Sequence, residues 1–260
     1  MIKTLIAQTS EVDDLESAVS EILEQLDIER NLRKNSVGIL SCYLDFMENG
    51  IVKALCEKLP FDVAGINALN SATSKGEGPI ALSLAVLTSD DVFFSAGISA
   101  SLAREYEEPV QELYERTSAN QRGNPSLILA FVPLPNYSTA SEYLVDALSA
   151  ASGNSPIFGM VPSDFTTDLR KPLVLFNGDT YKDSMAVILM FGPVNPRFTC
   201  MAIPEEKMLK RKAVITSSQG NILKEINGFP ALDFIKSVGL VENGQFVKMQ
   251  VIPLILDHDD

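Results

Sequence analysis

The chain has 260 residues, of which 46% are hydrophobic and 21% are charged, and its formal net charge at pH 7 is -13. This balance is that of a globular protein and excludes a disordered one, and the length suffices for one large or two modest domains. Phosphate backbones and anionic lipid headgroups repel a chain this acidic, so we expect neither nucleic-acid binding nor membrane insertion.

The sequence also predicts the compartment. No apolar run reaches the roughly 18 residues of a transmembrane helix, and the apolar N-terminal run is too short for a secretory signal. Cys42, Cys56 and Cys200 are odd in number and lie in apolar contexts, which is typical of small buried core residues. We therefore expect a soluble, cytoplasmic protein.

Strand and helix signals alternate through the first third of the chain. Short apolar runs predict buried strands, and apolar residues spaced by three and four predict amphipathic helices. Ser10 is a candidate N-cap for the first helix, and Pro60 ends the second. In chain order, we expect a strand at 2–7, a helix at 12–29, a strand at 36–42, a helix at 50–59 and strands at 62–67 and 80–87.

A polar segment separates the last two of these strands. The glycines and hydroxyl residues of 70–78 predict a loop without regular structure. After the strand at 80–87, Asp90 and Asp91 favour a hairpin turn, because aspartate tolerates turn geometry well.

From residue 92 the same order of elements starts again. Residues 173–179 are an insertion relative to the first copy, and Asn177-Gly178 is a strong signal for a two-residue hairpin turn. Ser138 is the expected cap of the second helix in this copy. We expect a strand at 92–97, a helix at 102–117, a strand at 126–132, a helix at 138–151 and strands at 156–160, 185–191 and 197–203.

We therefore predict an α/β fold in which a β-α-β-α-β-β unit is duplicated. Mixed sheets are covered by helices, and the two units are related by a pseudo-twofold axis. The repeats span about 1–90 and 91–203 and together form one domain, 1–203. The tail, 204–260, carries strand signals, an Asn227-Gly228 turn and a helix at 231–238, and we interpret it as the start of a second, truncated domain.

The chain offers few groups for catalysis. Its one histidine, His258, lies in a terminal acidic run, and any Ser-His-Asp or Cys-His pair would need it. Zinc-binding spacings, the phosphate-loop pattern and the Gly-x-Ser-x-Gly elbow are absent from the sequence. We predict no catalytic residues, no metal site and no cofactor.

Two polar loops are the best candidates for a binding site. Each follows the carboxyl end of an apolar strand, where open α/β sheets bind ligands. Their neutral hydrogen-bonding groups suit a small polar ligand better than a multiply charged one. The alternative is that both are hydroxyl-rich surface loops. The candidate residues are Asn67, Asn70, Ser71 and Thr73 in the first loop and Ser163, Asp164 and Phe165 in the second.

Short motifs follow one another in the second copy and in the tail. They are Pro156-Ile157-Phe158-Gly159, Ser163-Asp164, Leu175-Phe176-Asn177-Gly178, Asp183-Ser184-Met185, Gly220-Asn221, Ile226-Asn227-Gly228 and Pro230-Ala231-Leu232. This succession resembles the FIST sensory domain family, although Met160 stands where that family has a second glycine. On this resemblance, 1–203 corresponds to the N-terminal FIST domain and 204–260 to an incomplete C-terminal one.

The resemblance implies a prokaryotic sensory domain of signal transduction. It would bind a small molecule, with amino acids among the proposed ligands, and would pass its signal to a partner protein. Two alternatives stay open. One is an enzyme that uses carboxylate or hydroxyl chemistry, with Asp164, Asn67 and Thr73 converging between the copies. The other is a protein-interaction module that works through an exposed apolar surface.

Overall fold

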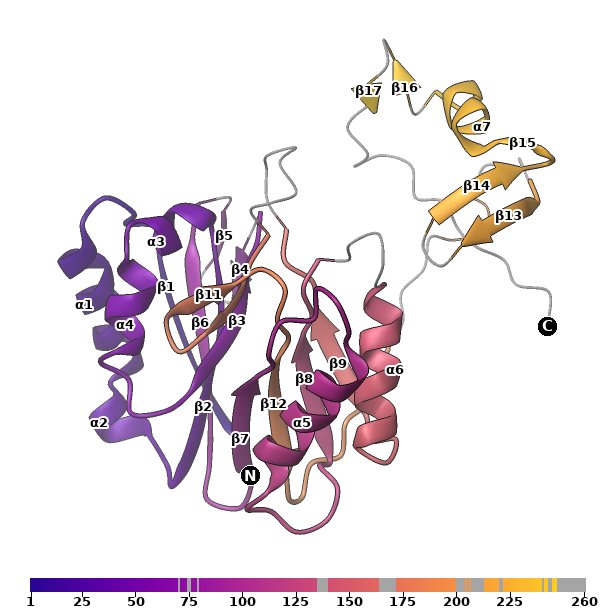
Figure 1. The fold of residues 1–260 in the computed structure, drawn as a ribbon. Coiled ribbons are helices and arrows are strands. Elements are labelled where there is room, and N and C mark those ends of the chain that lie inside the picture. The colour runs from indigo at the N-terminus through magenta and orange to yellow at the C-terminus, as the bar shows by residue number, and fades with distance from the viewer. Residues whose placement is uncertain are drawn as a thin grey trace. The chain divides into compact units, whose positions relative to one another are not determined.

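A computed structural model provides the fold of the chain (Figure 1). It describes residues 1–69, 71–73, 76–78, 80–134, 140–163, 172–199, 204, 206, 213–219, 222–239, 241–242 and 245–246. The chain divides into two compact units, Met1–Phe198 and Thr199–Asp260. No helix in the described part of the chain has the length and apolar character needed to cross a membrane.

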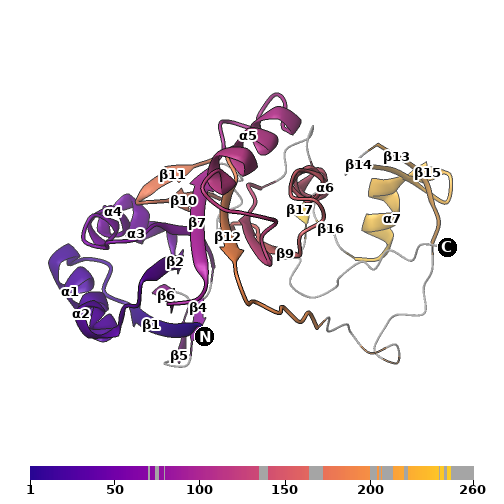
Figure 2. The same cartoon turned by 90° about the horizontal axis from the view of Figure 1, so that it is seen from below.

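The first unit contains two sheets that pack face to face, each with helices on its outer face (Figures 1 and 2). The strands of the first sheet are β1 (Lys3–Thr9), β2 (Asn35–Cys42), β3 (Val63–Asn67), β6 (Leu82–Ser89), β10 (Val174–Phe176) and β11 (Asp179–Tyr181). They are ordered β1-β6-β2-β3-β10-β11. The helices of this half are α1 (Leu15–Leu26), α2 (Ile28–Asn31), α3 (Leu44–Glu48) and α4 (Ile51–Cys56).

The second sheet has four strands in the order β7-β12-β8-β9. They are β7 (Phe93–Ile98), β8 (Leu127–Phe131), β9 (Ile157–Met160) and β12 (Ala186–Phe191), and the helices are α5 (Glu107–Ser118) and α6 (Ser141–Ala151). Strands β1-β6-β2-β3 and β7-β12-β8-β9 share one pattern of two antiparallel pairs followed by one parallel pair. The predicted mixed α/β class is confirmed, whereas the pseudo-twofold axis stays a prediction.

Three apolar clusters hold the layers together. Alternate residues of a strand point to opposite faces of its sheet, so each strand serves two clusters. In β2, Leu40 and Cys42 pack under α1 and α4, while Val37 packs between the sheets. In β12, Leu189 packs under α5 and α6, while Ile188 packs between the sheets. Because the chain buries both faces of its central strands, those strands appear in the sequence as continuous apolar runs.

Two glycines occupy matching positions in the parallel strand pairs. Gly65 of β3 pairs with Leu40 of β2, and Gly159 of β9 pairs with Ala130 of β8. A Cβ atom would lie 1.9 Å from the Leu40 carbonyl oxygen at Gly65 and 2.2 Å from the Ala130 carbonyl oxygen at Gly159. Only glycine permits this close approach of the two backbones.

The hairpin β10–β11 belongs by sequence to the second half but lies in the sheet of the first. β10 pairs antiparallel with β3 over Val174–Phe176. Its turn residue Asn177 has a left-handed φ of 50°, as a two-residue hairpin turn requires. The Val63 amide donates to Asn177 Oδ1 at 2.8 Å, and the Asn177 amide donates to the Val63 carbonyl at 2.9 Å. The predicted hairpin is therefore present, and it links residues 114 positions apart in the sequence.

Several local predictions are wrong. Asp90 and Asp91 do not close a hairpin, because β6 and β7 lie in different sheets and the segment crosses between them. The segment 70–78, predicted to lack regular structure, contains the short paired strands β4 (Ser71–Thr73) and β5 (Gly76–Gly78). Residues 197–199 form no strand, and the rest of the strand predicted at 197–203 lies outside the described residues.

The expected helix caps also differ. Asp14, not Ser10, caps α1, since its carboxylate accepts a hydrogen bond from the Ser17 amide at 3.0 Å. Ala140 occupies the N-cap position of α6, and Ser138 lies outside the described residues. Asp27, with a φ of 43°, ends α1 and separates it from α2, so the helix predicted over 12–29 is interrupted.

Within its described residues, the second unit shows a small three-stranded sheet, a two-stranded sheet and the helix α7. Its elements are β13 (Ile215–Gln219), β14 (Ile222–Ile226), β15 (Phe229–Pro230), α7 (Ala231–Ser237), β16 (Val241–Glu242) and β17 (Gln245–Phe246). Asn227, with a φ of 53°, forms the turn between β14 and β15. Its amide donates to the Val214 carbonyl, and the Val214 amide donates to Asn227 Oδ1, both at 2.8 Å. This is the arrangement that Asn177 forms with Val63.

Candidate functional site

The predicted site lies where β3 and β9 end. Both strands are the parallel partners of a neighbouring strand, and their carboxyl ends meet because the Ser163 amide donates to the Asn67 carbonyl at 3.1 Å. The structure therefore brings together one predicted residue from each half of the first unit. At the carboxyl ends of parallel strands, backbone groups point outward and are available to a ligand.

Asn67 is the structural centre of this junction. It is 1% exposed, and its Oδ1 atom accepts a hydrogen bond from the Leu173 amide at 2.7 Å. The Asn67 amide in turn donates to the Leu173 carbonyl at 3.1 Å. Asn67 thus joins the end of β3, the segment after β9 and the residue that precedes β10. Ser163 is half-buried beside it.

For the other predicted site residues, the structure describes only the backbone or nothing at all. Ser71 and Thr73 lie in β4, which directly follows the junction, but their side chains are outside the described part of the chain. Asn70, Asp164 and Phe165 lie outside the described residues altogether. The convergence of Asp164, Asn67 and Thr73 that an enzyme would need therefore stays a prediction.

Two helices of the second half begin at this end of the sheets. The α6 N-cap, Ala140, makes no side-chain capping bond, and the buried Oγ of Ser141 has no partner among the described residues. Tyr106 at the start of α5 stacks on Tyr143 of α6, with ring centroids 6.3 Å apart and an angle of 14° between the planes. The amide groups at a helix N-terminus carry partial positive charge, which favours acceptor groups of a ligand.

Metal-ligand clusters are absent from the described residues, and the thiols of Cys42 and Cys56 are buried or half-buried. No cluster of three or more His, Cys, Asp or Glu side chains is placed to hold a metal within the described ranges. Cys42 is fully buried, and burial raises the pKa of its thiol. Burial, with a smaller effect from the Asp179 and Glu57 charges, raises the pKa of Cys56 to about 12. Both thiols are therefore protonated near pH 7 and are poor nucleophiles.

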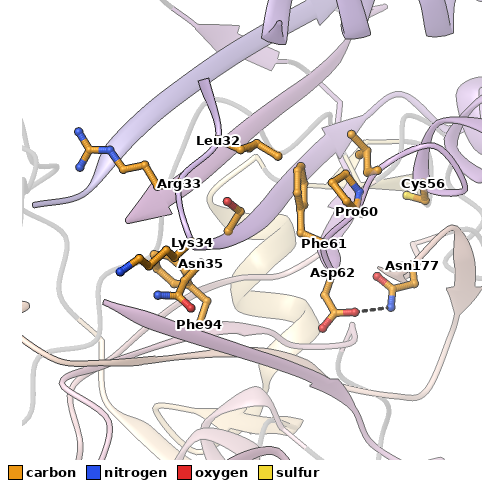
Figure 3. Close-up of a pocket in the computed structure, with 12 residues that line it drawn as sticks. Leu32, Arg33, Lys34, Asn35, Cys56, Pro60, Phe61, Asp62, Phe94 and Asn177 are labelled. Carbon is orange, nitrogen blue, oxygen red and sulfur yellow. Dashed lines mark hydrogen bonds between the residues drawn. The ribbon is translucent and has the colours of Figure 1, made fainter. Parts of the chain in front are cut away.

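A groove at the opposite end of the first sheet was not predicted from the sequence. It has a volume of about 770 Å³ and is formed by the segments before β2 and β3, with Phe94 and Asn177 (Figure 3). Its walls come from four segments far apart in the chain. Pro60 at its edge indicated only the end of a helix, and no local pattern joins the four segments.

Comparison with known proteins identifies the family. Residues 36–228 match the family described as the FIST N domain. The chain belongs to the FIST family. The FIST domain is a sensory domain of signalling proteins, so the resemblance found in the short motifs is confirmed, and so is the sensory class of the protein.

Comparisons with solved structures and with curated proteins give less information about the chain than the family match. The chain is similar to a structure titled cyanuric acid hydrolase, evolutionary innovation by structural concatenation, with 9% identity, a TM-score of 0.39 and coverage of 74% of this chain and 68% of that one. It is also similar to the cyanuric acid hydrolase of A. caulinodans, with 11% identity, a TM-score of 0.37 and coverage of 74% and 71%. Hydrolysis is a property of those proteins. No curated protein matches the chain.

Proposed function

We propose that this FIST domain senses a small polar ligand, such as an amino acid, and catalyses no reaction on it. The observation that carries the proposal is the junction of Asn67 and Ser163, where both halves of the first unit meet at the carboxyl ends of their parallel strands. The same end holds the N-terminus of α6, whose N-cap residue Ala140 makes no side-chain capping bond. The placed side chains of Asn67, Ser163 and Ser141 are neutral donors and acceptors, which favours a ligand recognised by hydrogen bonds over one recognised by net charge.

The junction also suggests how binding would be transmitted. Leu173, bonded to Asn67 in both directions, leads directly into β10. A ligand that shifts Asn67 would therefore move the hairpin that joins the two halves. The signal would leave through a partner protein that reads this movement, and we propose the cytoplasmic location that the cysteines and the N-terminal residues predict.

A thermal-shift screen of the whole chain against the amino acids and small polar metabolites tests this function. A ligand that binds only the folded state raises the melting temperature, by mass action. The affinity of a hit is then measured by calorimetry in the parent and in Ser163→Ala. Loss of one neutral hydrogen bond, about 1 kcal/mol, should weaken binding by roughly fivefold.

The matched control is Ser126→Ala, which removes a serine hydroxyl at the amino end of β8, where it donates to the Gly192 carbonyl. It should leave the affinity unchanged. A folded sample that no compound stabilises would contradict the proposal. So would a hit that is consumed during incubation, because turnover would make the protein an enzyme.

A further inference from the structure

The groove of Figure 3 has two walls of different character. One wall is the segment of residues 32–36, which leads from α2 into β2. The other is the segment 59–62, which leads from α4 into β3. The groove therefore opens at the amino ends of these strands, whereas Asn67 lies at the carboxyl end of β3.

Most polar groups of the first wall are already bonded within the protein. Arg33 Nη1 donates to the Met1 carbonyl at 2.6 Å, and Arg33 Nε lies 4.0 Å from Asp90. Asn35 Nδ2 donates to the Ser89 carbonyl at 3.4 Å, and the Ser36 and Thr88 hydroxyls are 2.8 Å apart. These bonds hold the wall in place. One cationic side chain of the wall forms no salt bridge with a described residue.

That cation is Lys34. Its side chain is exposed, and no carboxylate of the described residues lies within salt-bridge distance of it. Its charge acts only at longer range. The pKa of Asp91 is lowered first by the bonded N-terminal ammonium, and Arg33 and Lys34 add smaller effects.

The second wall carries a carboxylate that no described cation neutralises. Asp62 Oδ1 accepts a hydrogen bond from Asn177 Nδ2 at 2.8 Å, and Asp62 forms no salt bridge with any described cation. Figure 3 shows Lys34 and Asp62 on different sides of the groove, with the Phe61 ring above Asp62 and beside Pro60. Pro60 and Phe94 extend the apolar surface around that ring.

From this arrangement we infer a second binding site, for a small zwitterion whose ammonium and carboxylate groups are separated by an apolar spacer. A ligand of one sign would gain one attraction and meet one like charge. A zwitterion gains both attractions, and its spacer covers the aromatic surface. The volume of about 770 Å³ lies in the range usual for small-molecule pockets.

Three probes of equal chain length test the inference on the whole protein: 6-aminohexanoate, hexanoate and hexylamine. Binding is followed by shifts of backbone amide signals in a titration monitored by nuclear magnetic resonance. We expect 6-aminohexanoate to shift the amides of Lys34, Asn35 and Asp62 and to bind at least about threefold more tightly than either singly charged probe. The amides of Asn67 and Ser163 should not move, which separates this site from the junction.

Lys34→Gln and Asp62→Asn should each weaken 6-aminohexanoate binding to the level of a singly charged probe. Asparagine at position 62 can still accept from Asn177, so the fold should be kept. Lys182→Gln and Asp146→Asn remove exposed charges away from the groove and serve as controls that should leave binding unchanged. Equal affinities for the three probes, no shift at the groove, or equal binding by Lys34→Gln would each overturn the inference.

Discussion

At the scale of single residues, alanine substitutions at Gly65 and Gly159 should lower the stability of the first unit most clearly. An added Cβ atom at either position would clash with a backbone carbonyl oxygen of the neighbouring parallel strand. Backbone cannot move aside as a flexible side chain can, so Gly65→Ala and Gly159→Ala should each destabilise the first unit by about 2 to 4 kcal/mol. Urea unfolding followed by circular dichroism measures the change.

Gly78 provides the control, because no atom of the described residues lies within 4 Å of an added Cβ atom there. Gly78→Ala should change the free energy of unfolding by less than about 0.5 kcal/mol. A loss below about 1 kcal/mol in Gly65→Ala would show that β2 and β3 separate more easily than their close approach indicates.

The same scale shows what residue patterns could reveal about the site. Asn67 and Ser163 could be placed at strand ends because each follows an apolar run of strand length. Their meeting could be expected only from the equivalence of the two halves. The bonds of Asn67 to Leu173 could not be predicted, since they join residues 106 positions apart that share no local pattern.

At the scale of elements, the asparagine of each Asn-Gly turn binds back to the residue at the start of the neighbouring strand, or to the one just before it. Asn177 does this with Val63 and Asn227 with Val214, so β13-β14-β15 repeats the arrangement of β3-β10-β11. The turn type was evident from the sequence because only a few residues tolerate left-handed φ values. The strand that each turn contacts depends on tertiary packing and was not evident.

Asn177→Ala tests the contribution of this turn. It removes the two side-chain hydrogen bonds, from the Val63 amide and to Asp62. It also puts alanine at a left-handed φ, which asparagine tolerates better, so we expect a loss of about 2 to 3 kcal/mol. Hydrogen exchange of the Val63 amide should speed up, because that amide loses its acceptor. Asn227→Ala is the matched variant and should leave Val63 exchange unchanged. Protection of Val63 that survives Asn177→Ala would argue against the role of the turn.

The elements also show where local signals fail. Short apolar runs predicted β1, β2, β3, β6 and all four strands of the second sheet, since burial of both faces makes a strand apolar throughout. The hairpin β10–β11 was expected from its Asn-Gly turn. Two acidic turn residues between β6 and β7 favoured a hairpin, yet these strands enter different sheets. A turn signal reports only that the chain reverses, and the choice of sheet is made by side-chain packing on each face.

At the scale of the molecule, all three apolar clusters lie within Met1–Phe198. We therefore expect residues 1–198, expressed alone, to unfold in one cooperative transition. The urea midpoint should equal that of the first unit in the full chain, because no cluster loses a member. Circular dichroism and exposure of apolar surface to a fluorescent dye measure this. A fragment that binds the dye strongly and unfolds gradually would mean that the second unit completes the core.

The crossing of β10 into the first sheet has a consequence for synthesis on the ribosome. Val63 and Asn177 are 114 residues apart, and translation adds about 5 to 20 residues per second, so β3 waits roughly 6 to 23 s for its neighbour. Throughout that interval the nascent first half exposes an apolar strand edge, which is a template for wrong pairing. A chaperone that shields nascent chains would therefore act on this protein after β3 has emerged and before β10 arrives.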